Sequence, residues 1–410
     1  MTTLLILGIG NRDFKRYMLK SLLDGGYRVI LLDSVAPDWV DEYVVDKRAV
    51  DLLDSKAVME AAISLHKIYK FSGVYTFDEW QVETTARLAR RLGLPGLTEE
   101  AAFRCRDKHA MRSAFAAAGV PSAASSACLD VGEAIVAANA VGYPVVIKPR
   151  NLAASIGVVR ANCEEELRSY FADVQNSRYP NIPVEPGVLI EEYLEGPEFS
   201  VECVVQDGKT HVCGITEKTV GFAPFFLEMG HLAPPVGSDT RHDRIIELVH
   251  AAHAALDVRF GATHVELRYT SRGPCVIEVA ARLGGDRIPY ITKLSSGIDV
   301  VAASAASVTG GEVSVTPTIG RIAGIRMIYP EYDGVVRALG VSDAREKIWT
   351  EIGWWATVGQ RVRLPPRSFT SRLAYVMAVG DSREEVQRRL GAAEEALSIV
   401  VEADLRGPSD

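Results

Sequence analysis

Several hallmarks of common protein classes are missing from this 410-residue chain. Its six cysteines include no CxxC pair, which argues against a zinc ribbon or disulfide scaffold and predicts buried thiols in a reducing compartment. The formal net charge is −8, so no overall positive field is available to hold nucleic acid or an anionic membrane. No stretch approaches the roughly 20 apolar residues that span a bilayer. We therefore expect a cytoplasmic protein that acts on small molecules.

The order of expected strands and helices predicts two kinds of sheet. The first part alternates strand and helix, which favours a parallel sheet, at residues 4–7, 14–23, 28–32, 73–77 and 81–92. A later part is rich in short strands and contains one helix, which indicates an antiparallel α+β layer, at residues 187–192, 198–205, 211–217, 243–256, 264–269 and 274–279.

A glycine pair follows the first expected strand. Gly8 and Gly10 half-match a dinucleotide fingerprint, with Asp33 at the end of the second strand, but the third glycine position holds Asp13. We favour a tight turn into a helix over binding of a nicotinamide dinucleotide. The interpretation as a nicotinamide dehydrogenase depends on these glycines alone, and failure to bind NAD would exclude it.

Two lysines lie where burial of a positive charge is expected to be energetically unfavourable. Lys148 ends an apolar strand, where an ammonium is expensive to desolvate unless an anion meets it, and Lys108 opens a helix. A solvated strand end is the ordinary alternative for each. The loop 151–157, which contains Ser155, is rich in small residues that leave backbone N–H groups free to hold phosphates. We expect this loop to join two antiparallel strands as a flap that closes over a ligand.

The strongest feature is a pair of glutamates in two short strands. Glu266 and Glu278 are separated by a turn at 271–274, and pairing of the strands as a hairpin would bring both carboxylates to one face. Like charges repel there unless a divalent cation lies between them, and oxygen ligands of this type suit Mg²⁺. Arg282 would stabilise negative charge on a transferring phosphoryl group or an acyl phosphate. The alternative is a set of structural ion pairs with Arg268 and Arg282.

Five segments in this order resemble the ATP-grasp superfamily, specifically the bacterial L-amino acid ligases that form dipeptides. They are RDKHAMRSAFAAAGVP at 106–121, VVIKPRNLAASIG at 145–157, EEYLEGPEF at 191–199, ATHVE at 262–266 and IEVAARLGG at 277–285. The resemblance implies an ATP-grasp fold of the α/β and α+β classes. It divides the chain into a Rossmann-like domain (1–105), a central subdomain with the flexible loop (106–190), a metal and phosphate subdomain (191–315) and an appended C-terminal subdomain (316–410).

The resemblance also implies roles for single residues. The phosphates of ATP would be bound by Lys108, Lys148, Lys218 and His231, and the loop of Ser155 would close over them. Adenine would be bound by Glu191, Glu192 and Leu194, and the ribose by Glu198. Magnesium, with manganese as an alternative, would be held by Glu266 and Glu278. Catalysis would rest on Arg282, Lys148 and His231.

One position departs from the superfamily pattern. Many ATP-grasp enzymes carry Asn two residues after the second metal glutamate, and this chain has Ala280. A third side-chain ligand is therefore missing, which leaves the number of metal ions open.

The activity that these residues imply is ATP-dependent joining of a carboxylate to an amine through an acyl phosphate. Asp286 would meet an α-ammonium and Arg287 a carboxylate, next to Gly285, although a surface ion pair fits them equally well. Glu79 follows a predicted parallel strand, where open α/β sheets bind ligands. The substrates would be small acids and amines, such as amino acids, and a homodimer is expected. The alternatives are a carboxylase acting through carboxyphosphate and a non-catalytic nucleotide-binding module.

Overall fold

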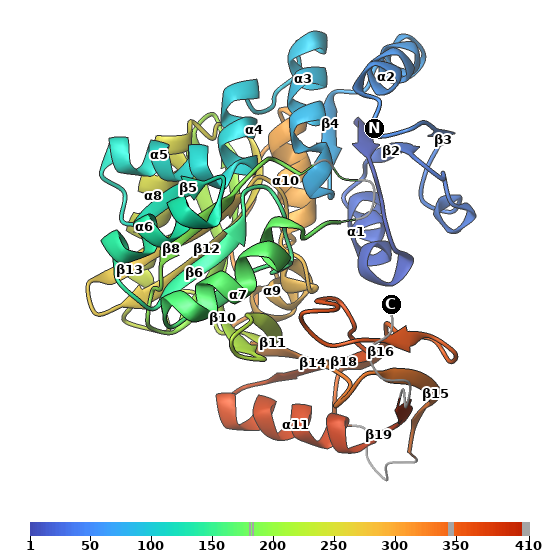
Figure 1. The fold of residues 1–410 in the computed structure, drawn as a ribbon. Coiled ribbons are helices and arrows are strands. Elements are labelled where there is room, and N and C mark those ends of the chain that lie inside the picture. The colour runs from blue at the N-terminus through green and yellow to red at the C-terminus, as the bar shows by residue number, and fades with distance from the viewer. Residues whose placement is uncertain (180–181, 183, 343–347, 404–410) are drawn as a thin grey trace. The chain divides into compact units, whose positions relative to one another are not determined.

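The computed structural model describes residues 1–179, 182, 184–342 and 348–403. The described chain packs as two compact units, each built from three segments (Figure 1). The first unit contains Met1–Ala123, Leu194–Thr216 and Val236–Thr318, and the second contains Ala124–Tyr193, Glu217–Pro235 and Ile319–Asp410. The four predicted domain boundaries stay a prediction. No helix in the described part of the chain is both long and apolar enough to cross a bilayer.

A four-stranded parallel sheet opens the first unit, as the alternation of strand and helix predicts. Its strand order is β3-β2-β1-β4, with bounds Asp46–Ala49, Arg28–Asp33, Thr3–Leu7 and Gly73–Thr76. Helix α1 (Arg12–Asp24) packs with Leu4 and Ile6 in one cluster, whereas α2 (Ser55–Tyr69) packs with Leu5 and Leu7 in another. Because successive strand residues face opposite sides, the two helices cover opposite faces. Strand β3 and helix α2 were not predicted from the sequence.

The turn after β1 is tight and leads into α1, as we expected. Gly8 and Gly10 have φ of 73° and 66°, a left-handed conformation that glycine adopts without strain. The N–H of Ile9 donates to Oδ2 of Asp33 at 2.7 Å, and Asn11 caps α1 by accepting from the N–H of Asp13. Asp33 therefore fixes the loop itself.

The first unit continues with short helices and an antiparallel layer. The helices are η1 (Asp38–Val40), η2 (Glu79–Gln81), α3 (Val82–Leu92), α4 (Glu99–Arg106), α5 (Lys108–Ala118), α8 (His242–Leu256), α9 (Ile288–Ser296) and α10 (Val300–Thr309). The layer contains β13 (Gly273–Ala280), β12 (Gly261–Thr270), β9 (Glu198–Gln206) and the first part of β10 (Lys209–Gly221). Apolar side chains of β9 and β12 pack against α5 and α8, which anchors the strands that carry the candidate site.

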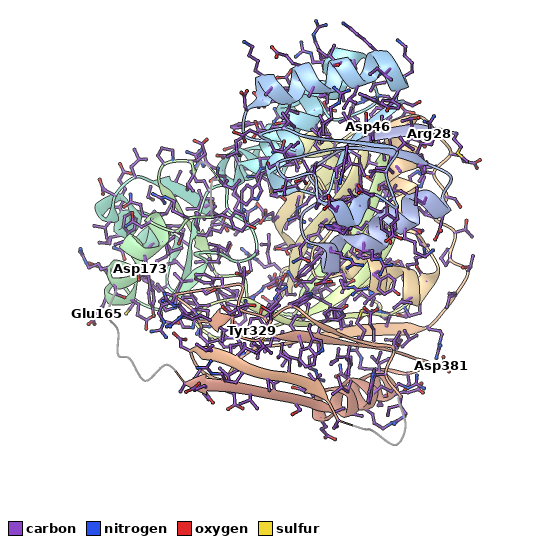
Figure 2. All side chains as sticks on the ribbon, turned by 90° about the vertical axis from the view of Figure 1, so that its right-hand side faces the viewer. Arg28, Asp46, Glu165, Asp173, Tyr329 and Asp381 are labelled. Carbon is purple, nitrogen blue, oxygen red and sulfur yellow. The ribbon has the colours of Figure 1, made fainter. Side chains whose placement is uncertain are left out.

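The second unit contains the expected hairpin of two antiparallel strands. Strands β5 (Ser125–Cys128), β8 (Val188–Glu192), β6 (Val145–Pro149) and β7 (Val159–Ala161) form an antiparallel sheet in that order. It shares a core with α6 (Val131–Val141) and α7 (Glu164–Gln175). Figure 2 shows Glu165 and Asp173 of α7 pointing outward, while Phe171 on the other face is buried.

The C-terminal segment extends a sheet of the second unit. Strand β14 (Ile322–Ile328) pairs with β11 (Leu227–Ala233), and the order continues through β18 (Ala374–Gly380) to β16 (Glu351–Trp354). Pairing with β14 covers the backbone edge that β11 would otherwise expose. Helix α11 (Arg383–Glu395) packs on these strands. A small sheet adds β17 (Arg361–Val362), β15 (Gly334–Val341) and β19 (Leu397–Ala403).

All six cysteines are free thiols, and the prediction that they are buried holds for five of them. It is wrong for Cys163, which is exposed. This residue lies at the N-cap position of α7, where the chain turns at the surface.

Candidate active site

The two glutamates singled out in the sequence face each other across a hairpin. Glu266 of β12 is the register partner of Glu278 of β13, so both side chains leave the same face of the sheet. The side chains are 21% and 17% exposed, so both are accessible. Just beyond this pair the register skips Ile277, a bulge of the kind that is common beside functional sites. The predicted convergence of the two acids is confirmed.

Each of these acids contacts a basic group. Nζ of Lys108, at the start of α5, lies 3.0 Å from Oε1 of Glu278. Nε2 of His264 lies 3.2 Å from Oε1 of Glu266, and its Nδ1 lies 2.5 Å from Oε1 of the buried Glu202. Burial alone would lower the pKa of His264, but Glu202 and Glu266 raise it to about 9. The imidazole therefore carries a positive charge between two carboxylates.

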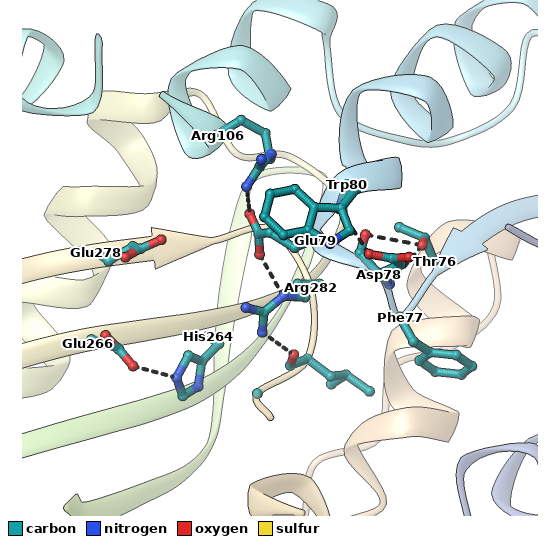
Figure 3. A network of polar contacts seen from close by, with 12 residues as sticks. Thr76, Phe77, Asp78, Glu79, Trp80, Arg106, His264, Glu266, Glu278 and Arg282 are labelled. Carbon is teal, nitrogen blue, oxygen red and sulfur yellow. Dashed lines mark hydrogen bonds and ion pairs between the residues drawn. The ribbon is translucent and has the colours of Figure 1, made fainter. Parts of the chain in front are cut away.

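Arg282 is fixed by a carboxylate from the parallel sheet. Its Nε lies 2.6 Å from Oε2 of Glu79, and Nη1 of Arg106 lies 2.5 Å from Oε1 of the same side chain (Figure 3). Burial alone would raise the pKa of Glu79, but Arg282 and Arg106 lower it to about 2. The pKa of Arg282 is raised, because burial is outweighed by Glu79, Glu278 and Glu266. Arg282 therefore lies within the electrostatic reach of both acids of the hairpin.

Glu79 lies where the sequence predicts it, but its side-chain contacts differ from those that we expected. We expected a substrate contact at the end of a parallel strand, and Glu79 does follow β4 there. In the structure its side chain is 5% exposed, and each of its oxygens meets a guanidinium group. Glu79 therefore holds the guanidinium of Arg282 by an ion pair.

The other expected substrate residues follow β13. Asp286 and Arg287 are buried and have left-handed φ of 52° and 60°. The guanidinium of Arg287 lies over the rings of Tyr17 and Tyr290, 5.5 and 4.9 Å from their centroids. Gly285 is exposed beside them. The interpretation of Asp286 and Arg287 as a surface ion pair does not fit their burial.

Glu198, which we expect to contact the ribose, is bound by Arg268. Nε of Arg268 donates to Oε2 of Glu198 at 3.1 Å, and its Nη1 donates to the carbonyl of Leu194 at 2.8 Å. Arg268 is buried. These contacts fix the chain at Leu194 relative to β9 and β12.

In the second unit, Lys148 meets an anion, as its burial requires. Its Nζ lies 2.5 Å from Oε2 of Glu191, and the side chains are 5% and 4% exposed. Glu192, next in β8, accepts at Oε2 from the N–H of Ala124 at 3.4 Å. The solvated alternative for Lys148 is therefore wrong.

The loop between β6 and β7 has a strained tip. Ala154 and Ser155 both have positive φ, of 57° and 55°, which is costly for residues with a Cβ. The N–H of Ile156 donates to the carbonyl of Ala153, which closes the turn. Gly157 allows a close approach, since a Cβ there would lie 2.4 Å from Oγ of Ser177. The expected hairpin is confirmed, and its closure over a ligand stays a prediction.

Lys218 and His231 are register partners on β10 and β11 in the second unit. Nζ of Lys218 lies 2.8 Å from Oε1 of Glu228, and Nη2 of Arg372 lies 3.2 Å from Oε2 of the same carboxylate. His231 is buried beside them. The structure brings these two predicted residues together.

Several residues of these clusters were not found by sequence reasoning. Arg106 lies two residues before Lys108. Glu202 is an acid within the mostly apolar segment 199–205, and an acid in such a segment is a signal that could have found it. Glu228 and Arg372 carry no local signature, because their meeting depends on how β11 and the segment before β18 pack.

Three family models match successive parts of the chain. Residues 25–96 match the ATP-grasp N-terminal domain, residues 141–290 the ATP-grasp domain, and residues 326–402 the L-amino acid ligase C-terminal domain 2. The chain therefore has the predicted ATP-grasp fold, with its N-terminal domain. More particularly, the chain resembles L-amino acid ligases, and the third match extends this resemblance into the C-terminal part.

Named relatives agree with this resemblance. Alanine–anticapsin ligase from Bacillus subtilis strain 168 is 28% identical over 308 residues, which are 70% of this chain and 63% of that protein. The L-amino acid ligase structure from Bacillus licheniformis aligns with a TM-score of 0.82 and 24% identity, covering 98% of this chain and 99% of that one. A biotin carboxylase domain from Hydrogenobacter thermophilus, solved with MgADP and bicarbonate, aligns with a TM-score of 0.73 and 17% identity over 98% and 91% of the two chains. The two structures share the fold of this chain.

Proposed function

We propose that the protein is an ATP-dependent ligase that joins the carboxylate of one amino acid to the amine of another, releasing ADP and phosphate. The observation that carries this proposal is the register pairing of Glu266 with Glu278, with Arg282 held nearby by Glu79. The names of the relatives support amino acid substrates and make alanine a suitable first probe.

The residues of the hairpin fit a hard divalent cation. Two partly exposed carboxylates leave one face of the sheet, and oxygen ligands of this kind suit Mg²⁺, with Mn²⁺ as an alternative. Ala280 pairs with His264 in the register and supplies no ligand, so Glu266 and Glu278 are the protein side chains that we assign. When bound, the ion neutralises charge on the phosphates of ATP.

The basic and polar residues fit a nucleotide. Lys108 and Lys148 each contact a carboxylate, and anionic phosphates could compete for the same ammonium groups. We assign phosphate contacts to these lysines, to Lys218 and to the loop of Ser155. His231, buried beside Lys218, is assigned a contact near the same phosphates. Adenine and ribose contacts are assigned to Glu191, Glu192, Leu194 and Glu198.

The reaction has two steps. A carboxylate oxygen of the first amino acid attacks the γ-phosphorus of ATP, so that an acyl phosphate forms and ADP leaves. The neutral amine of the second amino acid then attacks the acyl carbon, phosphate leaves, and the nitrogen releases a proton. Arg282 offsets the negative charge in both steps, and Glu79 keeps its guanidinium in place. A closed loop 151–157 excludes water from the acyl phosphate.

The test is an amino-acid pair screen of the full chain with ATP and Mg²⁺, read by ADP release and by mass spectrometry of the product. We expect an amide product in a one-to-one ratio with ADP. ADP release that needs bicarbonate and no amine would instead support a carboxylase. Nucleotide binding without turnover would support a non-catalytic module. Light scattering tests the expected homodimer.

A further inference from the structure

Two charged side chains of the first unit lie outside the residues assigned above. Lys15 is in α1, close to its amino-terminal end, and Asp78 follows β4. Both are partly buried. A lysine near the start of a helix opposes the helix dipole, so its position calls for an explanation other than helix stability.

The two residues flank a particular place in the parallel sheet. The chain runs from β1 outward to β2 and β3, and then returns to β4 on the other side of β1. The order of strands thus reverses between β1 and β4, and the helices that follow β1 and β3 cover opposite faces. Open α/β sheets bind ligands at such a switch point, outside the carboxyl ends of the strands.

Lys15 has weak partners there. Its Nζ donates to the carbonyl of Phe77 at 3.4 Å and lies 5.6 Å from the centroid of the Phe77 ring. No carboxylate of the described residues forms an ion pair with it. Burial, then Arg282, lowers the pKa of Lys15 to about 8, while the nearby carboxylate of Asp78 acts in the opposite direction.

One carboxylate oxygen of Asp78 accepts a hydrogen bond. Its Oδ1 accepts from the N–H of Trp80 at 3.1 Å, which caps η2. Within the described part of the chain, its Oδ2 has no hydrogen-bond or ion-pair partner. A Cβ at Gly8 would lie 3.3 Å from this oxygen, so the glycine keeps the space beside it open. Burial raises the pKa of Asp78 above its ordinary value.

Both groups belong to the surroundings of Arg282. The guanidinium acts electrostatically on Lys15 and on Asp78, and it is held by Glu79, the residue next to Asp78. Figure 3 shows the carboxylates of Asp78 and Glu79 pointing in different directions, with that of Glu79 directed to Arg282. The cation and the anion therefore lie near the group to which we assign charge neutralisation in the reaction.

We propose that Asp78 binds the ammonium group of the amino acid that donates its carboxylate, and that Lys15 binds the carboxylate of the amino acid that donates its amine. This assignment rests on the proposed function. Each substrate then has its unreactive charge held at the sheet edge, while its reacting group lies toward Arg282.

A single amino acid bound by both residues does not fit the reaction. Its carboxylate and its amine would both be held, and neither would be available for bond formation. The two charges therefore serve two substrates, and the site selects α-amino acids in both positions.

The experiment uses the full chain, ATP and Mg²⁺, with L-alanine, L-alaninamide and N-acetyl-L-alanine as substrates. L-alaninamide has no free carboxylate and serves only as the amine donor, whereas N-acetyl-L-alanine has no ammonium and serves only as the carboxylate donor. The variants are Lys15→Met, which keeps an unbranched side chain of similar length without the charge, and Asp78→Asn, which keeps the cap at Oδ1. Lys20→Met and Asp24→Asn, on the exposed part of α1, are matched controls.

We expect Lys15→Met to raise the KM of alanine as amine donor roughly tenfold or more and to leave that of alaninamide unchanged. Asp78→Asn should raise the KM of alanine as carboxylate donor by a similar factor and leave that of N-acetylalanine unchanged. Equal changes for alanine and its analogue, or unchanged KM values in both variants with normal wild-type turnover, overturn the assignment alone. No ADP release by the wild type with any amino acid pair overturns the proposed function, and the assignment with it.

Discussion

Oε2 of Glu79 lies 2.6 Å from Nε of Arg282, and this ion pair joins the end of the parallel sheet to the segment that follows the β12–β13 hairpin. Arg106 completes the arrangement from the end of α4, with its guanidinium over the ring of Trp80 at 4.8 Å (Figure 3). A buried carboxylate between two guanidinium groups has a fixed geometry, because each oxygen meets a different arginine.

Replacement of this carboxylate tests its positioning role. We expect Glu79→Gln to lower kcat about 100-fold with a smaller change in KM for ATP, because Arg282 loses its fixed position. The free energy of unfolding should fall by about 3 kcal/mol, because two buried cations lose their counter-charge. Steady-state kinetics and urea unfolding measure the two effects. Glu83→Gln, on the exposed side of α3, is the matched control, and an unchanged kcat in Glu79→Gln would refute the role.

The same carboxylate predicts a dependence of stability on pH. The pKa of Glu79 is about 2, below its ordinary value of 4.5, so its contribution is fully present above pH 4.5 and is lost as the pH falls toward 2. The difference in unfolding free energy between the wild type and Glu79→Gln should be constant from about pH 5 to 7 and shrink below pH 4.5. Urea unfolding at stepped pH values measures it. A difference that does not change on acidification contradicts the assigned pKa.

Glu278 tests the metal assignment. Glu278→Gln keeps the size of the side chain and removes the charge, so we expect ADP release to fall at least roughly 100-fold and the Mg²⁺ requirement to rise. Circular dichroism should show an intact fold. Glu247→Gln, exposed on α8, is the control. Near-normal turnover of Glu278→Gln at low Mg²⁺ would defeat the assignment.

Lys148 and Glu191 allow a double-variant test in the second unit. Lys148→Met leaves a buried carboxylate without this partner and should lower the free energy of unfolding by about 3 kcal/mol. Adding Glu191→Gln should restore most of the stability and should not restore ATP binding, if Lys148 contacts the phosphates. Unfolding and calorimetric titration with MgATP separate the two effects. Arg168→Met, in an exposed pair with Glu164, is the control, and recovery of ATP affinity in the double variant would contradict the phosphate role.

Adjacent glycines test the packing beneath His264. A Cβ at Gly284 would lie 2.5 Å from Oε1 of Glu202 and 2.7 Å from Nδ1 of His264, whereas a Cβ at Gly285 meets nothing within 4 Å. We expect Gly284→Ala to destabilise the protein by about 1–3 kcal/mol. Gly285→Ala should change the unfolding free energy by less than about 0.5 kcal/mol. Equal unfolding free energies for the two variants would contradict this packing.

Local patterns were enough to predict much of the fold. Alternating apolar runs and helical periodicity located the first strands and α1, and the turn between two short strands predicted that Glu266 and Glu278 would face each other. Segments with weaker periodicity, such as β3, were not predicted.

The sequence by itself determined the class of fold, the order of its motifs and the acids of the hairpin, because these depend on residues close together in the chain. Only the tertiary structure decided the partners of those groups. Lys108 meets Glu278 across 170 positions, and Glu79 meets Arg282 from another sheet. Such contacts depend on how whole helices and sheets pack, and no local spacing encodes them. For that reason Glu79 was expected to contact a substrate, whereas in the structure it is buried between Arg106 and Arg282.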